Sequence, residues 1–272
     1  MPVILISRGT MSGATLLVDC LRERTGYRCI TREDLVGLVN QHGEIANRTV
    51  ETIGRAARAY EQFSQLRRPY VILMRLALLE FALHDNLVYS GYSGHLLVPY
   101  VRHFIRVRIS APLPLRVRMT MDRLKCGEEE AKEYILQEDQ RRGQWARFMY
   151  GKEIRDPHLY DLWVNLERMS LQAVCSLIQE MARESEFQAT PESQAEVEKL
   201  HLETLVEAAL AMDPRTQALE VGAQAEGGRI ELLGPYLEDD QLKVVESIVL
   251  GVDGVQGMIY TPGYAPTLSM TP

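Results

Sequence analysis

The 272-residue sequence contains few cysteines, no long apolar run and no excess of positive charge. Its four cysteines, Cys20, Cys29, Cys126 and Cys175, include no CxxC pair and lie near no histidine that could complete a metal site. This scattered pattern favours small buried thiols in a reducing compartment over a zinc site or a disulfide framework.

Charge and hydropathy disfavour two further classes of protein. The formal net charge of -7 is the opposite of the basic footprint that general DNA- or RNA-binding proteins carry, so we expect no nucleic-acid partner. The longest apolar stretch, 70–83, is interrupted by Arg75 and Glu80 and falls short of the roughly 20 apolar residues that cross a bilayer. The apolar run before Ser7 is too short for a signal peptide. We therefore expect a cytoplasmic protein with no transmembrane segment.

Strand-like and helix-like segments alternate over the first two thirds of the chain. The expected strands lie at 3–7, 27–31, 87–90, 104–109 and 161–166. Alternation of this kind indicates an α/β domain of three layers, a parallel sheet with helices on both faces, which we place at residues 1–186. Such sheets bind ligands at the carboxyl ends of their strands, so we expect a site in the loops after Ser7 and Ser90.

A smaller pattern follows a polar linker at 187–194. The order αββαβ comes from a helix at 195–212, strand-like runs at 219–223 and 229–233, a helix at 239–250 and a last strand at 254–260. We therefore expect a small α+β domain over 195–262 and a loose tail over 263–272.

The loop after the first expected strand is similar to a phosphate-binding loop without its lysine. The window consists of Arg8, Gly9, Thr10, Met11, Ser12, Gly13, Ala14 and Thr15. In the G-x-x-x-x-G-K-[ST] pattern, Gly13 is the second glycine and Thr15 supplies the hydroxyl that would meet Mg²⁺. Arg8 replaces the first glycine, and Ala14 replaces the lysine that neutralises a transferring phosphate. Arg8 is our candidate for the missing charge, although strand–glycine–helix turns also occur in proteins that bind no phosphate.

An arginine-rich helical stretch is the second candidate for phosphate binding. Arg141, Arg142 and Arg147 carry forked guanidinium groups, which bind phosphate oxygens through charge-assisted hydrogen bonds. A solvated helix face paired with neighbouring glutamates would explain the same residues, and this alternative stays open.

Several segments resemble the cytidylate-kinase-like family in order and spacing over residues 2–183. They are Ile6-Ser7-Arg8 with Ser12-Gly13, the turn at 31–35, the fourth strand and its Ala-Pro turn at 106–112, the paired arginines at 115–118, the lid at 139–148 and the turn at 156–162. In the divergent branch of that family the lysine of the phosphate loop is already absent. The resemblance implies a P-loop kinase fold.

The resemblance also implies a site and an activity. ATP with Mg²⁺ would bind at the phosphate loop, with Thr15 at the metal, and the three lid arginines would close over the donor phosphates. The acceptor, a pyrimidine nucleoside monophosphate, would lie beside Arg32, Gly91, Tyr92 and Arg116, although Tyr92 stands where the family has arginine. Two alternatives are an inactive kinase-like nucleotide sensor or scaffold and an interaction protein that binds no nucleotide.

Residues 195–262 resemble a BON domain, at Asp213-Pro214, 228–234 and 251–255. This resemblance implies binding of phospholipid surfaces, small ligands or proteins, and nothing in the segment indicates catalysis. The acidic run Glu238-Asp239-Asp240 would repel an anionic membrane. We therefore expect a protein or small-ligand partner, or association into a homo-oligomer.

Overall fold

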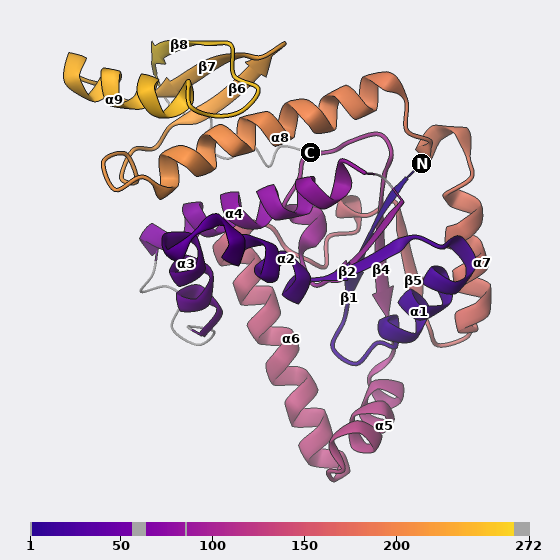
Figure 1. Ribbon diagram of the computed structural model, residues 1–272. Coiled ribbons are helices and arrows are strands. Elements are labelled where there is room, and N and C mark those ends of the chain that lie inside the picture. The colour runs from indigo at the N-terminus through magenta and orange to yellow at the C-terminus, as the bar shows by residue number, and fades with distance from the viewer. Residues whose placement is uncertain (1, 56–63, 85, 264–272) are drawn as a thin grey trace. The chain divides into compact units, whose positions relative to one another are not determined.

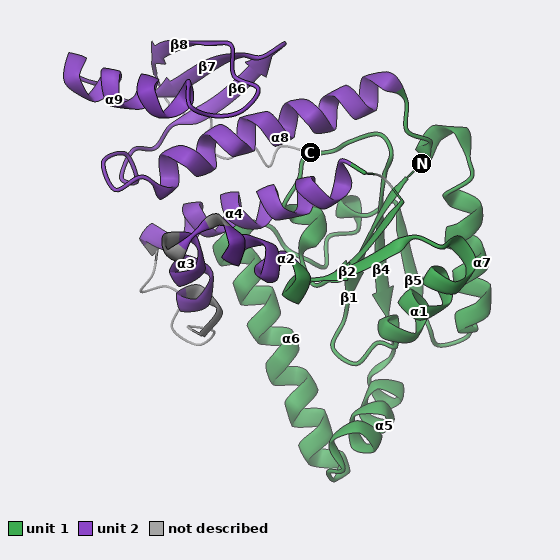
Figure 2. Cartoon of the chain, in the orientation of Figure 1, with its two compact units in different colours: residues 1–34, 84–190, 272 green, residues 35–83, 191–271 purple. Residues whose placement is uncertain are grey.

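The computed structural model describes residues 2–55, 64–84 and 86–263, which form two compact units (Figures 1 and 2). Unit 1 contains the residues up to Asp34 together with His84–Thr190. Unit 2 contains Leu35–Leu83 together with the residues from Pro191 onward. The second unit therefore joins a segment from the first half of the chain to the C-terminal residues, a grouping that the sequence pattern does not suggest. The domain boundaries expected from the sequence stay a prediction.

A five-stranded parallel sheet forms the centre of unit 1 (Figure 1). Its strands are β1 (Val3–Arg8), β2 (Arg28–Thr31), β3 (Leu87–Gly91), β4 (Phe104–Ser110) and β5 (Leu162–Asn165). Their order is β2-β3-β1-β4-β5, which places Ser7 of β1 between Gly91 of β3 and Arg108 of β4. Every residue from Val3 to Ser7 is buried, so both faces of β1 are covered. The expected α/β architecture is confirmed.

Four helices of unit 1 connect these strands or follow them. They are α1 (Ala14–Thr25), α5 (Leu113–Leu124), α6 (Glu128–Tyr150) and α7 (Leu171–Met181), with short 3-10 turns at Gly94–Leu96, Pro157–Leu159 and Ser185–Phe187. Helix α2 (Arg32–Val39) crosses the division between the units. Gly26 ends α1 in the left-handed conformation, and the Ser170 hydroxyl accepts a hydrogen bond from the Ala173 N–H at the start of α7. Both caps agree with the sequence.

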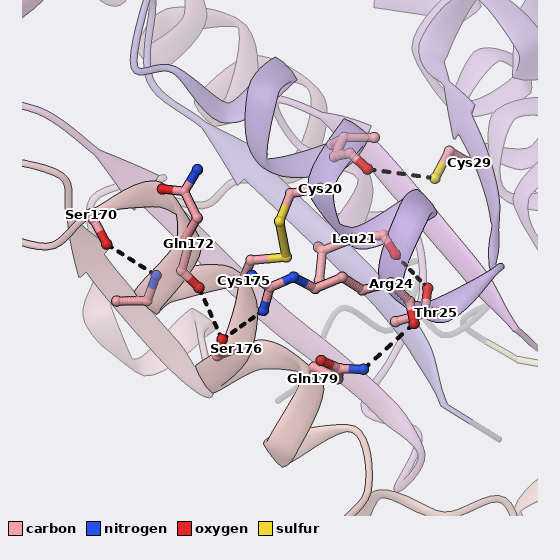
Figure 3. The surroundings of a disulfide bond; sticks show 12 residues. Cys20, Leu21, Arg24, Thr25, Cys29, Ser170, Gln172, Cys175, Ser176 and Gln179 are labelled. Atoms are coloured by element: carbon pink, nitrogen blue, oxygen red, sulfur yellow. Dashed lines mark hydrogen bonds between the residues drawn. A yellow bond between two sulfur atoms is a disulfide. The ribbon is translucent and has the colours of Figure 1, made fainter.

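The core on one face of the sheet explains a disulfide bond that the sequence analysis did not expect. Helices α1 and α7 pack on the same strands, where Leu17 and Ile178 join one apolar cluster with Ile4. Cys20 of α1 and Cys175 of α7 form a disulfide across this contact, with their Cα atoms 6.4 Å apart (Figure 3). The prediction of free buried thiols was therefore wrong for this pair, which lies 155 residues apart in sequence. Among the described cysteines, Cys29 and Cys126 are free.

Unit 2 combines helices from both parts of the chain with a small sheet. It contains a 3-10 turn (Asn40–His42), α3 (Glu44–Arg55), α4 (Ser64–Ala82), α8 (Pro191–Met212), β6 (Gly222–Glu226), β7 (Arg229–Gly234), α9 (Asp239–Val249) and β8 (Gly257–Pro262). Strand β7 lies at the centre, antiparallel to β6 and parallel to β8. The expected αββαβ order is present, and the expected tail lies outside the described residues after Gly263.

Helices α4 and α8 pack together within unit 2. Their contact is a small apolar cluster that includes Ile72 and Leu76 of α4 and Ala208 and Ala211 of α8. Proline has a different place in each helix, and Pro69 lies inside α4. Helix α8 begins at Pro191, within the expected linker, because the fixed φ angle of proline suits a first helical turn.

No helix among the described residues is both long and apolar enough to cross a membrane. The cytoplasmic location expected from the sequence stays a prediction.

Candidate functional site

The loop between β1 and α1 turns sharply at two left-handed residues. Met11 has a φ angle of 53° and Gly13, the residue that precedes α1, has a φ angle of 81°. Glycine adopts this conformation at little cost, which explains its presence at position 13. Gly13 itself has no side chain that could cap α1. The helix therefore begins with a positive partial charge at the carboxyl end of β1, an arrangement that suits an anion.

Thr10 connects this loop to α5 and α6. Its hydroxyl donates to Asp139 Oδ1 at 2.7 Å and accepts a hydrogen bond from Arg142. Its carbonyl accepts from Arg116 Nε at 2.7 Å, and Arg116 also pairs with Asp139 at 2.8 Å. Burial raises the pKa of Asp139, but the hydrogen bonds from Thr10 and Arg116 outweigh burial and hold that pKa below its ordinary value. Asp139 is therefore a fixed negative charge that orients the loop and one arginine.

Tyr92, just after β3, is a platform for two arginines. The guanidinium carbon of Arg142 lies 3.5 Å from the centre of the Tyr92 ring, and that of Arg8 lies 5.0 Å away, distances at which cation–π attraction acts. The Tyr92 carbonyl accepts a hydrogen bond from Ser7 Oγ at 2.8 Å. The Tyr92 ring is thus held beside the phosphate-type loop, and the guanidinium groups of Arg142 and Arg8 lie over it.

A cavity of about 160 Å³ lies beside the loop, among residues from the carboxyl ends of β1 and β4. Its lining includes one carboxylate, Asp139, and five arginines: Arg8, Arg108, Arg116, Arg142 and Arg155. We call this space the arginine cavity. On a protein with a net charge of -7, this concentration of positive charge indicates an anionic ligand.

A larger cavity of about 390 Å³ lies along α6 and the turn that follows it. It shares Asp139, Ile154 and Arg155 with the arginine cavity. Arg147 also lines it and pairs with Glu153 at 3.0 Å. The two cavities are therefore neighbours with a common wall.

The lid arginines expected from the sequence have three different environments. Arg142 reaches Thr10 and lines the arginine cavity. Arg141 pairs with Glu138 at 2.6 Å and lines neither cavity. Arg147 faces the larger cavity only. The structure thus brings one of the three to the loop.

The residues expected at the acceptor side are also separated. Gly91 and Tyr92 lie at the end of β3 beside the loop, and a Cβ atom at Gly91 would collide with the Tyr89 ring. Arg116 binds the loop itself through Thr10. Arg32 begins α2 and lines neither cavity.

Sequence reasoning missed Arg108, Arg155 and Trp163 as lining residues of the arginine cavity. Arg108 is only 7% exposed and donates to Ser7 Oγ at 2.8 Å. Burial lowers its pKa, although a guanidinium stays protonated in proteins. The available signal was a charged residue inside an apolar strand, because such a residue is seldom buried without a specific reason.

The loop fits a magnesium ion that arrives on a nucleotide better than one held by the protein alone. Thr15 is exposed, and its hydroxyl accepts a hydrogen bond from Arg8 at 3.3 Å, which a metal would have to displace. The described residues contain no cluster of three or more His, Cys, Asp or Glu side chains able to hold a metal. Magnesium is often bound by few protein oxygens, with substrate phosphates and water as its other ligands.

Comparison with known proteins gives a family match and a curated relative. Residues 3–168 match the family model described as the cytidylate kinase-like family. A cytidylate kinase of Ignicoccus hospitalis (strain KIN4/I / DSM 18386 / JCM 14125) is 28% identical over 185 residues, which are 66% of this chain and 99% of that protein.

The solved structures that match are more distant in sequence. An uncharacterized protein from Eubacterium ventriosum ATCC 27560 is 15% identical, with a TM-score of 0.49, over 67% of this chain and 99% of its own. TT1252 from Thermus thermophilus is 16% identical, with a TM-score of 0.44, over 67% and 97%. A shikimate kinase from Bacteroides thetaiotaomicron is 13% identical, with a TM-score of 0.39, over 67% and 99%.

Proposed function

Because this chain belongs to the cytidylate kinase-like family, we propose that it transfers the γ-phosphoryl group of Mg²⁺–ATP to a nucleoside monophosphate, with a pyrimidine base as the expected acceptor. The observation that carries the proposal is the junction at Thr10, where Arg142 and Asp139 of α6 meet the loop that opens α1. In phosphoryl transfer the protein contributes mainly position and positive charge. The junction supplies both at the carboxyl end of β1.

Each part of the loop has a role in this proposal. The backbone around Gly13 and the start of α1 hold phosphate oxygens, and Thr15 meets the magnesium ion. Ser12 Oγ is buried and has no hydrogen-bond partner among the described residues, so it is available to a phosphate oxygen. Arg8 and Arg142 provide the positive charge that Ala14 does not. ATP with Mg²⁺ supplies the transferable group and neutralises its charge.

A second candidate function is a nucleotide sensor that transfers no phosphate. Two observations favour it: Ala14 stands in place of the loop lysine, and Tyr92 stacks on Arg142 where the acceptor side is expected. We propose for this alternative that the αββαβ segment is a BON-like module that contacts a protein, a small ligand or a second copy of this chain. The packing of α4 against α8 within unit 2 supports a connection between this module and the segment after β2.

Calorimetric titration with Mg²⁺–ATP and with CMP, alone and together, followed by a coupled turnover assay, tests the proposal. Binding of both nucleotides with turnover supports the kinase. Binding of one or both without turnover favours the sensor. No binding of either overturns both candidates, and thermal denaturation gives an independent check because a ligand at 100 times its Kd adds about 2.7 kcal/mol of stability.

A further inference from the structure

Three arginines of the arginine cavity have no carboxylate partner. Arg116 pairs with Asp139, and Arg142 lies 3.3 Å from Glu138. Arg8, Arg108 and Arg155, in contrast, form no ion pair with any residue that the structure describes. Burial is the main cause that lowers the Arg108 pKa; Tyr160 and Asp139 oppose it, and the charge of Arg155 adds to it. The cavity therefore gathers positive charges that repel one another.

Arg108 is the most telling of the three because it is buried. Its side chain donates one hydrogen bond to Ser7 Oγ, and its buried Nε has no partner within the described part of the chain. The rings of Tyr160 and Trp163 lie 6.0 and 5.9 Å from its guanidinium carbon. Removing a charge from water is costly unless an opposite charge and hydrogen bonds compensate for it. The aromatic rings and Asp139, whose ion pair is with Arg116, compensate only in part, so a counter-charge from outside the protein is expected.

The size of the cavity limits what that counter-charge can be. A volume of about 160 Å³ is a few times the roughly 30 Å³ that a water molecule occupies in the liquid. It is also smaller than the roughly 300–1,000 Å³ of pockets that enclose whole drug-sized ligands. A tetrahedral oxyanion fits this space, and a nucleoside does not.

We propose that the arginine cavity is a subsite for a phosphate-sized oxyanion, with Arg108 as its buried binding residue and Arg8 and Arg155 as its further cationic contacts. This inference rests on the proposed function for the source of the anion, which is a phosphoryl group of the bound nucleotide. Arg108 then provides, from β4, the buried positive charge that the loop lacks at Ala14. Arg155, which is exposed, meets the anion from the side of solvent.

The fluorescence of Trp163 offers a direct test, because this residue lines the cavity and the chain contains two tryptophans. In a Trp145→Phe background, Trp163 is the sole indole. Inorganic phosphate, pyrophosphate and Mg²⁺–ATP are titrated separately at constant ionic strength. We expect saturable fluorescence changes with a phosphate-bearing ligand and none with chloride alone.

Variants then assign the change to particular arginines. Arg108→Gln is expected to weaken anion affinity at least tenfold, Arg155→Gln by a smaller factor, and Arg108→Lys by an intermediate one because lysine keeps the charge but loses the forked geometry. Arg183→Gln is the control, since Arg183 pairs with Glu180 on an exposed surface outside the cavity. Thermal denaturation establishes that each variant folds. If Arg108→Gln does not fold, the exposed Arg155 and the Arg108→Lys variant still test the subsite.

The outcomes separate the subsite from the proposed function. Arginine-dependent binding of both phosphate and Mg²⁺–ATP supports both. Arginine-dependent binding of phosphate without any nucleotide binding supports a site for a free oxyanion and overturns the proposed function. Binding of Mg²⁺–ATP with the same affinity in wild type, Arg108→Gln or Arg108→Lys, and Arg155→Gln overturns the subsite and leaves the function standing. No binding of any of these ligands overturns both.

Discussion

Units 1 and 2 bury charge in opposite ways. In unit 1, the buried Arg108 lies in a cavity whose lining includes five arginines and one carboxylate. In unit 2, Glu207 of α8 is 8% exposed and lies close to Arg75 and Arg68 of α4, whose positive charges act on its pKa. The cavity in unit 1 therefore collects an excess of positive charge, and the cluster in unit 2 combines both signs.

The charges of unit 2 connect its two sequence segments. Glu207 accepts a hydrogen bond from the Ala223 N–H at 3.3 Å, and Arg68 donates to the Leu219 and Val221 carbonyls. These contacts join α4 and α8 to the chain that enters β6. Charges of both signs therefore lie together within the protein and compensate one another, although Glu207 Oε2 is buried without a hydrogen-bond partner among the described residues.

Whether buried charges are compensated within the protein separates structural clusters from binding sites. A buried set of charges that compensate one another contributes to architecture, although its net stabilisation is modest because desolvation opposes it. A set with a large excess of one sign is incomplete until a ligand brings the opposite charge, and such sets are typical of binding and active sites. Changes in unit 2 should therefore alter stability, and changes in the arginine cavity should alter activity.

The largest effect is expected for Glu207→Ala. Removing the carboxylate takes away a buried negative charge beside Arg75 and Arg68 together with the acceptor of the Ala223 N–H, and breaking a buried charge pair costs about 3–5 kcal/mol of unfolding free energy. Urea denaturation measures the loss, and turnover per folded molecule should stay within about twofold of wild type. Glu198→Ala, exposed on the same helix, should change stability by no more than about 0.5 kcal/mol. A loss of unfolding free energy below about 1 kcal/mol for Glu207→Ala would show that this charge cluster does not stabilise unit 2.

The second largest effect is expected for Arg142→Ala in unit 1. Arg142→Ala should lower kcat/KM by about 10²–10³, by analogy with the loss of one donor to a transition-state charge. Its unfolding free energy should fall by less, about 1–2 kcal/mol, because the lost contacts are one hydrogen bond to Thr10, one ion pair with Glu138 and the stack on Tyr92. Steady-state kinetics and urea denaturation of one preparation test both parts, with Lys132→Ala as the control. Equal losses of stability and activity would contradict the contrast between the units.

Reduction of the Cys20–Cys175 disulfide should affect unit 1 only. Opening this link should lower the stability of that unit by about 2–4 kcal/mol, since the bond restricts a long loop in the unfolded chain. Calorimetric scans with and without reductant measure the shift, and Cys20→Ser should reproduce it without reductant. Cys126→Ser is the control because Cys126 is free. A shift of the same size in Cys126→Ser would refute the assignment.

The smallest effect is a difference in pH dependence between the units. Burial raises the pKa of Glu207 above its ordinary 4.5, so its contribution to stability is full below pH 4.5 and is lost as the pH rises through the folded pKa. The pKa of Asp139 is lowered, so its contribution is present above pH 3.8 and is lost as the pH falls.

Unfolding free energies measured from pH 3 to 8 test this difference in sign. Glu207→Gln should flatten the decline above pH 4.5, which for one proton is at most about 1.4 kcal/mol per pH unit. Asp139→Asn should flatten the decline at the acid end instead. If Glu207→Gln leaves the slope above pH 4.5 as it is in wild type, the assignment of that slope to Glu207 is wrong.

The sequence by itself determined the local elements and their order. Apolar runs and apolar periodicity located all five strands of the parallel sheet and the αββαβ order after them. These signals are local, because the residues that a strand or helix buries lie close together in the sequence. Glycine and serine fixed the ends of helices in the same local way, at Gly13, Gly26 and Ser170. The phosphate-type loop was found for the same reason, since it lies within a few residues of one strand and one helix.

Only the tertiary structure decided which distant residues meet. The order β2-β3-β1-β4-β5 places β4 beside β1, which brings Arg108 to Ser7 and into the arginine cavity. The packing of α1 and α7 on one face brings Cys20 to Cys175. Neither pairing is encoded in spacing along the chain, because long-range contacts depend on how the whole sheet is ordered and covered. The charge of Arg108 was visible in the sequence, but its burial without a carboxylate partner was decided by the fold.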